Sequence, residues 1–143
     1  MDSTRTAIRS AVFVHGAGGG GWEWAPWARV FAAAGLSVAA PDLRAAPAGL
    51  AATTLADYSA QVADWRAAVA RPRVLVGASL GGLLAAMNAG GADALVLVNP
   101  MPPRGLPDAP HRPAVVPWGR SASLAGTRRA LPGADDAAAL FAF

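Results

Sequence analysis

A short apolar run that ends at a glycine-framed serine constrains the fold of this chain more than any other stretch. Residues 73–76 read RVLV, residues 77–81 read GASLG, and a run typical of a helix follows at 83–87. This order of strand, turn and helix is the context in which G-x-S-x-G forms a nucleophile elbow. The turn holds Ser79 where a base and amide donors can reach its hydroxyl. The stretch therefore predicts a nucleophilic serine on an α/β framework.

Length and composition indicate one globular domain. The chain has 143 residues, of which 54% are hydrophobic, so it can bury a core and is not of the disordered class. The net charge is +3, but the basic residues are dispersed, and we expect no nucleic-acid partner. There is no cysteine, which excludes disulfides and thiolate metal sites. The first apolar run, residues 11–14, is too short for a signal-peptide core or a membrane span. We therefore expect a cytoplasmic protein without a membrane partner.

Four apolar runs, each followed by a glycine, proline or asparagine break, predict four strands. They cover residues 8–14, 36–40, 74–76 and 94–98, and helices are expected between them. The last run is apolar at every position, as expected for a parallel strand covered on both faces. The order β-α-β-α-β-α-β predicts the α/β class, with a parallel sheet, flanking helices and functional loops at the C-terminal ends of the strands.

The clearest helix signal follows Thr54. Thr54 can cap a helix, and Asp57 stands three residues later, as the partner in a capping box does. Apolar residues then recur at helical spacing as far as residue 70. A second helix is expected with Pro26 in its first turn and should be stopped by Gly35. Prolines crowd residues 102–117, which excludes a helix or central strand there, and short helices are expected at 123–131 and 135–141.

Several of these motifs, taken in order, resemble the N-terminal half of an α/β-hydrolase. They are the pair at residues 15–16 (HG) after a strand, a small-residue loop before Trp22, residues 41–43 (PDL) after the next strand, and residues 77–82 (GASLGG). The run at 54–58 (TLADY) is most similar to the methylesterase and hydroxynitrile lyase branch. The resemblance covers roughly residues 7–103. It implies an incomplete sheet of that family, with the first four core strands and the start of a cap.

The resemblance assigns roles to residues near the serine. It implies that Ser79 is the nucleophile and that the backbone amides of Ala17 and Leu80 form the oxyanion hole. The supporting loop contributes three residues: His15, Gly16 and Gly18. Lyase members usually carry a hydroxyl residue directly after the loop histidine. Gly16 in that place favours an esterase-type site.

The resemblance also implies that part of the catalytic machinery is missing. Complete members carry an acid and a catalytic histidine after later strands. His15 lies in the oxyanion loop and His111 in the proline-rich segment, so neither is expected to be the general base. The expected reaction is hydrolysis of a carboxylic ester, thioester or lactone through an acyl-enzyme on Ser79. This chain alone is expected to be inactive or nearly so, and to need no cofactor or metal.

The implied organisation has two parts. Residues 1–100 would form the N-terminal part of the hydrolase core, and residues 101–143 the proline-rich segment and the beginning of a helical cap. The strand at 94–98 would then present an open apolar edge. We therefore expect a second chain or a second copy to complete the sheet, in addition to a small ester-like substrate as partner.

Other interpretations stay open at this stage. The chain could be an inactive half-fold that binds a small ligand or a partner, and Ser79 could merely cap the helix that follows. The glycines at 18–21 could bind phosphate or a dinucleotide, although G-x-G-x-x-G spacing and a Walker lysine are both missing.

Two further groups have a structural and a functional interpretation. Trp22, Trp24 and Trp27 are expected to pack a helix start against the sheet rather than line an acyl pocket. Asp42 follows a strand as a triad acid would, but it precedes the serine in the chain. We expect it to fix its loop through hydrogen bonds.

Overall fold

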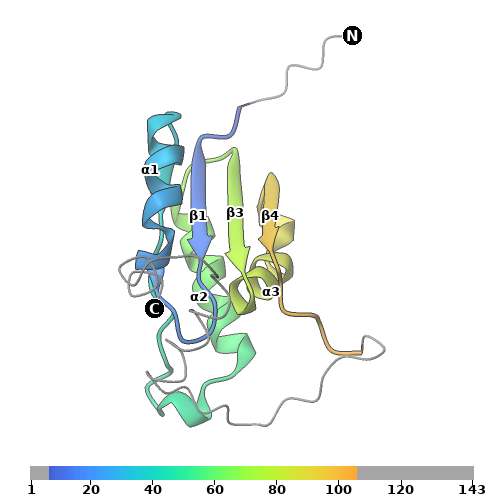
Figure 1. The fold of residues 1–143 in the computed structure, drawn as a ribbon. Helices are drawn as coiled ribbons and strands as arrows, with labels where there is room; N and C mark the ends of the chain where they lie inside the picture. The colour runs from blue at the N-terminus through green and yellow to red at the C-terminus, as the bar shows by residue number, and fades with distance from the viewer. Residues whose placement is uncertain (1–6, 106–143) are drawn as a thin grey trace. The chain divides into compact units, whose positions relative to one another are not determined.

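The computed structural model describes residues 7–105. In that part of the chain, four parallel strands form one sheet with helices on its faces (Figure 1). The strands are β1 (Ser10–Val14), β2 (Ser37–Ala39), β3 (Arg73–Ala78) and β4 (Ala94–Val98), in the spatial order β2-β1-β3-β4. The helices are α1 (Ala25–Ala33), α2 (Leu55–Ala68) and α3 (Leu80–Met87), with the 3-10 turns η1 (Gly21–Trp24), η2 (Leu50–Ala52) and η3 (Ala89–Gly91). The predicted parallel α/β sheet is confirmed.

The strand β1 organises the core because its side chains alternate between two buried faces. Phe13 points to the α1 side, where its ring lies 5.1 Å, centroid to centroid, from both Trp24 and Phe31. Val12 points to the other face and belongs to one buried cluster with Val62 of α2. The sheet is thus covered by α1 on one face and by α2 and α3 on the other.

The pairing register brings the candidate site together. β1 pairs with β3 along its whole length, so that Val14 lies opposite Gly77. The strands run in the same direction, and the residues that follow each strand therefore gather at one edge of the sheet. His15 after β1 and Ser79 after β3 are brought to that edge by the fold alone.

The element boundaries differ from the sequence prediction by small amounts, and the exception is the start of α3. The capping box of α2 is confirmed: Thr54 Oγ1 accepts from the amide of Asp57 at 3.3 Å, and the Asp57 carboxylate accepts from the amide of Thr54 at 2.7 Å. α3, by contrast, begins at Leu80 rather than at residue 83. The helix follows the serine directly because glycines 81 and 82 fit inside it against neighbouring backbone, where a larger residue would not.

The prediction that the last strand is covered on both faces is wrong for the described residues. Leu95, Val96, Leu97 and Val98 are each 37–41% exposed. β4 stands at one side of the sheet and pairs there only with β3, so its outer edge meets no other strand of residues 7–105. The helices expected at 123–131 and 135–141 lie outside the described residues.

Asp93, just before β4, accepts hydrogen bonds from residues at the start of β3. The stability that this contact adds should depend on pH. The Asp93 carboxylate accepts from the Arg71 guanidinium and from the amide of Arg73, the latter at 2.8 Å. The hydrogen bond from Arg71, followed by that from Arg73, lowers the pKa of Asp93 to about 2. An unfolded aspartate titrates near pH 3.9. The contact therefore stabilises the fold above about pH 4, and this contribution is lost as the pH falls toward 2.

We expect Asp93→Asn to lower the free energy of unfolding at pH 5 and to make little difference near pH 2. Urea unfolding followed by tryptophan fluorescence between pH 2 and pH 5 measures this difference. Asp64→Asn serves as the control, because Asp64 is exposed on α2 and makes no ion pair within residues 7–105. A gap between Asp93→Asn and the parent protein that stays constant over this range would contradict the assignment.

Candidate active site

Ser79 occupies a strained turn between β3 and α3. Its backbone has φ 51° and ψ −117°, in the positive-φ region that residues other than glycine seldom adopt. Such a conformation costs on the order of 1–3 kcal/mol and persists only where the surroundings impose it. Two hydrogen bonds impose it here: the Ser79 amide donates to the carbonyl of Val98 at 3.1 Å, and the amide of Met101 donates to the carbonyl of Ser79 at 2.8 Å. The serine is therefore held between the ends of β3 and β4.

Glycines on both sides of the serine permit the tight turn. A Cβ on Gly77 would lie 2.2 Å from the carbonyl oxygen of Gly81. A Cβ on Gly81 would lie 2.0 Å from the carbonyl oxygen of Val14 in β1. Both distances are far below van der Waals contact, so α3 can start this close to the sheet only because these residues have no side chain. The G-x-S-x-G spacing is thus required by the packing of strand against helix.

The loop after β1 comes directly against the serine. A Cβ built on Gly16 would lie 3.3 Å from Cβ of Ser79 and 3.9 Å from its Oγ. Gly18 has φ +75°, and the amide of Gly19 donates to the carbonyl of Gly16, which closes a turn in the loop. The structure therefore brings the predicted loop and the predicted nucleophile into contact.

His15 orients the peptide group that follows it. The ring is 5% exposed, and its Nε2 accepts a hydrogen bond from the amide of Leu43 at 2.9 Å. The proton of the neutral ring must then lie on Nδ1, which donates to the carbonyl of Gly16 at 2.8 Å. A peptide group is planar and trans, so fixing the Gly16 carbonyl also fixes the direction of the Ala17 N–H. The supporting role expected of His15 thus has a geometric basis.

The backbone amides of Ala17 and Leu80 have no hydrogen-bond acceptor at this edge within residues 7–105. Among the contacts of residues 7–105, neither the amide of Ala17 nor that of Leu80 donates to a protein group. Leu80 is the first residue of α3, where the helix offers its amide no partner. The backbone groups that sequence reasoning names for an oxyanion hole are therefore free to receive a ligand oxygen.

No general base contacts Ser79 in the described part of the chain. Both ring nitrogens of His15 are already engaged, with Leu43 and with Gly16. His111 lies outside the described residues. Between residues 7 and 105, no cluster of three or more histidine, cysteine, aspartate or glutamate side chains could hold a metal ion. Helices in the same range are all too short or too polar to cross a membrane.

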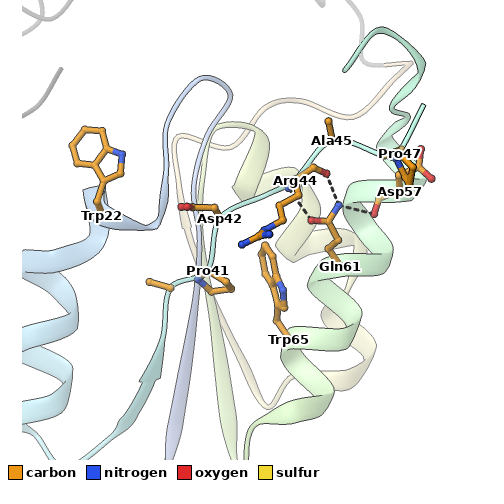
Figure 2. A pocket seen from close by; sticks show the side chains of 11 residues that line it. Trp22, Pro41, Asp42, Arg44, Ala45, Pro47, Asp57, Gln61 and Trp65 are labelled. Carbon is orange, nitrogen blue, oxygen red and sulfur yellow. Dashed lines mark hydrogen bonds between the residues drawn. The ribbon is translucent and has the colours of Figure 1, made fainter. Parts of the chain in front are cut away.

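A cavity of about 920 Å³ opens beside the site rather than over the serine. It lies between α2 and the segment after β2, and Trp22, Arg44 and Trp65 are among its lining residues (Figure 2). The side chain of Gln61 fixes one wall: its Oε1 accepts from the Arg44 amide at 2.9 Å, and its Nε2 donates to the Arg44 carbonyl at 2.8 Å. Neither Ser79 nor His15 borders this cavity.

Sequence reasoning did not find this cavity, because its lining comes from three separate stretches of the chain and carries no local motif. It was wrong about one of the three tryptophans, Trp22, which is 48% exposed. Trp24 is 5% exposed, and Trp27, although 41% exposed, packs edge-on against Phe13 of β1 at 6.5 Å between ring centroids, so both pack against the sheet as expected. Trp24 lies in η1 against Phe13 of the sheet, while Trp22 faces the cavity.

Comparison with known proteins agrees with this geometry. A model of the Alpha/beta hydrolase family matches residues 11–142. The chain belongs to the alpha/beta hydrolase family. Among solved structures, this family member is similar to polyneuridine aldehyde esterase at 27% identity, with a TM-score of 0.56 over 67% of this chain and 42% of the esterase. No curated protein sequence matches.

Two further structures share the fold at lower identity. They are a pyrethroid hydrolase from Sphingobium faniae JZ-2, at 24% identity and TM-score 0.57, and tomato methylketone synthase I, at 24% and 0.55. The alignments cover 66% and 69% of this chain but only 40% and 43% of those proteins. This member of the alpha/beta hydrolase family therefore spans about 40% of the length of the structures that it matches, and its four-stranded sheet is an incomplete version of the family fold.

Proposed function

We propose that this chain carries the nucleophile and the oxyanion hole of a serine hydrolase acting on a carboxylic ester, thioester or lactone. The observation that carries the proposal is Ser79 itself, held at φ 51° at the strand–helix junction with Gly16 against its side chain. The amides of Ala17 and Leu80, which donate to no protein group within residues 7–105, support it. The similarity to an esterase at 27% identity supports the choice of an ester-like substrate.

In the proposed mechanism, Oγ of Ser79 attacks the acyl carbonyl and forms a tetrahedral intermediate. The negative charge develops on the former carbonyl oxygen, where the amides of Ala17 and Leu80 would donate hydrogen bonds. Collapse of the intermediate expels the alcohol or thiol and leaves the acyl group on Ser79, and water then releases it. A base must take the serine proton in the first step. We propose that the acid–histidine pair which supplies it comes from outside this chain, so that the chain alone has little or no activity.

The experiment that tests the proposal is covalent labelling with a fluorophosphonate, which forms a stable bond only with an activated serine. The protein is incubated with the probe, its intact mass is measured, and the modified peptide is located by tandem mass spectrometry. We expect a single adduct on Ser79, and slower labelling when a competing ester is present. The labelling is carried out on the assembly that supplies the acid–histidine pair, since the chain alone is expected to react slowly or not at all. An adduct on another serine, or none in an assembly that hydrolyses an ester, would overturn the assignment.

A non-catalytic role is the second candidate, and the cavity of about 920 Å³ favours it. Two indoles and the Arg44 side chain line the cavity at a distance from the serine, so it could bind a small apolar or anionic molecule without chemistry (Figure 2). In that case fluorophosphonate would leave the protein unmodified. Binding of an aromatic carboxylate would instead quench tryptophan fluorescence in proportion to its occupancy.

We also propose that a second chain or a second copy pairs with the outer edge of β4, and that the protein is cytoplasmic. Four apolar side chains of β4 are more than a third exposed, and an open apolar edge favours strand addition. Sedimentation velocity should therefore show a dimer or larger species, or a stable complex with a second polypeptide. A single sharp monomer peak across micromolar concentrations would count against this pairing.

A further inference from the structure

The loop at residues 15–21, here called the oxyanion loop, is held by hydrogen bonds at both of its ends. The Gly21 amide, where the loop ends and η1 begins, donates to Oδ1 of Asp42 at 2.7 Å. At the near end, the amide of Leu43 donates to His15. Two consecutive residues of the segment after β2 thus hold both ends of the loop at 15–21. Figure 2 shows Asp42 beside this loop, on the segment that also borders the cavity.

Asp42 touches the loop closely along its last two residues. A Cβ on Gly20 would lie 3.2 Å from Oδ1 of Asp42. A Cβ on Gly21 would lie 1.8 Å from the carbonyl oxygen of Ala40, so the loop packs directly on the end of β2. A glycine-rich loop has many alternative conformations, and a carboxylate that accepts from one of its amides selects among them more strongly than a neutral acceptor does.

We propose that Asp42 is a positioning residue of the oxyanion hole: it holds the glycine loop so that the Ala17 amide keeps its direction beside Ser79. The inference rests on the proposed function of Ser79 for its catalytic part, whereas the contact between Asp42 and the loop stands independently of it. Asp42 does not touch the reacting atoms. It acts through the Gly21 amide, in the same way that His15 acts through the Gly16 carbonyl at the other end.

The test compares Asp42→Ala, which removes the acceptor, with Asp42→Asn, which keeps an oxygen in the same place. Asp64→Ala is the control, since Asp64 is an exposed acid on α2. The first readout is amide hydrogen exchange. We expect exchange in residues 16–22 to be at least about tenfold faster in Asp42→Ala and much less affected in Asp42→Asn. The peptide that covers α2 should exchange at the same rate in both Asp42 variants as in the parent protein, and residues 16–22 should exchange at the parent rate in Asp64→Ala.

The second readout is the kinetics of fluorophosphonate labelling. Asp42→Ala should lower the limiting rate of modification at Ser79 by about tenfold or more while leaving the half-saturating probe concentration unchanged, and Asp42→Asn should restore most of the rate. If Asp42 served only to stabilise the fold, Asp42→Ala would raise the exchange rates of the loop and of α2 together. Asp42→Asn would then not restore the labelling rate.

The two readouts separate the two proposals. If the parent protein is not labelled even in the assembly that supplies the acid–histidine pair, the proposed function fails, and hydrogen exchange alone decides the role of Asp42. If labelling occurs but loop exchange is unchanged in Asp42→Ala, the positioning role is overturned. Should Asp42→Ala fail to fold, Asp42→Asn and the parent are compared, and faster exchange spread evenly over the chain would overturn the role as well.

Discussion

Replacing Ser79 with alanine should abolish fluorophosphonate labelling and lower any ester hydrolysis by at least about 10³-fold. The substitution removes the oxygen that would form the acyl-enzyme, while the amides of Ala17 and Leu80 stay in place. Only a small residual rate of ester hydrolysis, from hydrogen bonds to the oxyanion, should therefore remain. The measurements are intact mass after labelling and the initial rate of hydrolysis of a p-nitrophenyl ester, each with the protein in the assembly in which it is isolated.

The fold should tolerate this change. The Ser79 side chain makes no hydrogen bond within residues 7–105, and alanine resembles serine in its preference at positive φ, so the midpoint of thermal unfolding should shift by only a few degrees. Ser37→Ala is the matched control, because Ser37 is an exposed serine on β2. It should keep both labelling and turnover. An adduct that persists in Ser79→Ala would show that another residue is the nucleophile.

Replacing Gly81 with alanine should destabilise the protein by about 3–5 kcal/mol. The new methyl group would lie 2.0 Å from the carbonyl oxygen of Val14 and 2.5 Å from that of His15. Neither oxygen can rotate away, because both belong to backbone at the end of the central strand β1. The only relief is to move α3 away from the sheet. Denaturant unfolding followed by fluorescence gives the free energy directly, and a loss of this size is a large part of the 5–15 kcal/mol that stabilises a typical domain.

Gly90→Ala is the matched control for that experiment. A Cβ on Gly90 meets no atom within 4 Å, and its φ lies outside the left-handed region, so its substitution should change stability by no more than about 0.5 kcal/mol. Equal stability of the two alanine variants would mean that α3 does not approach β1 as closely as described. The shift of α3 should also displace Ser79, so Gly81→Ala should lose fluorophosphonate labelling even where it remains folded.

The sequence predicted best what depends on local chemistry. The turn at Ser79 and the capping box of Thr54 and Asp57 depend on residues a few positions apart, and the structure contains both. The parallel sheet followed from the alternation of apolar runs with helical ones. The spatial order of the strands did not, because it depends on how each crossover packs, and several orders suit the same run of elements.

The sequence pattern did not predict the contacts between residues that are far apart in the chain. Nothing in the spacing of His15 and Leu43 indicates that they share a hydrogen bond, nor that Gln61 clamps the backbone of Arg44. The open outer edge of β4 was expected, whereas the exposure of its apolar side chains was not, for a related reason. An all-apolar strand predicts cover on both faces, but the cover has to come from other segments, and residues 7–105 do not provide it. The roles of Ala17 and Leu80 still await the labelling experiment.

The long pairing between β1 and β3 has a consequence during synthesis on the ribosome. Ser10 pairs with Arg73, so about 60 residues must be translated after β1 before its main neighbour exists. At about 5–20 residues per second, this leaves the strand without its main neighbour for roughly 3–12 s. Only the three residues of β2 can pair with it in that time, and its five positions are all buried in the finished fold. The nascent chain thus displays this apolar strand before its main partner has been made, and its yield in cells should depend on chaperones that bind such segments early.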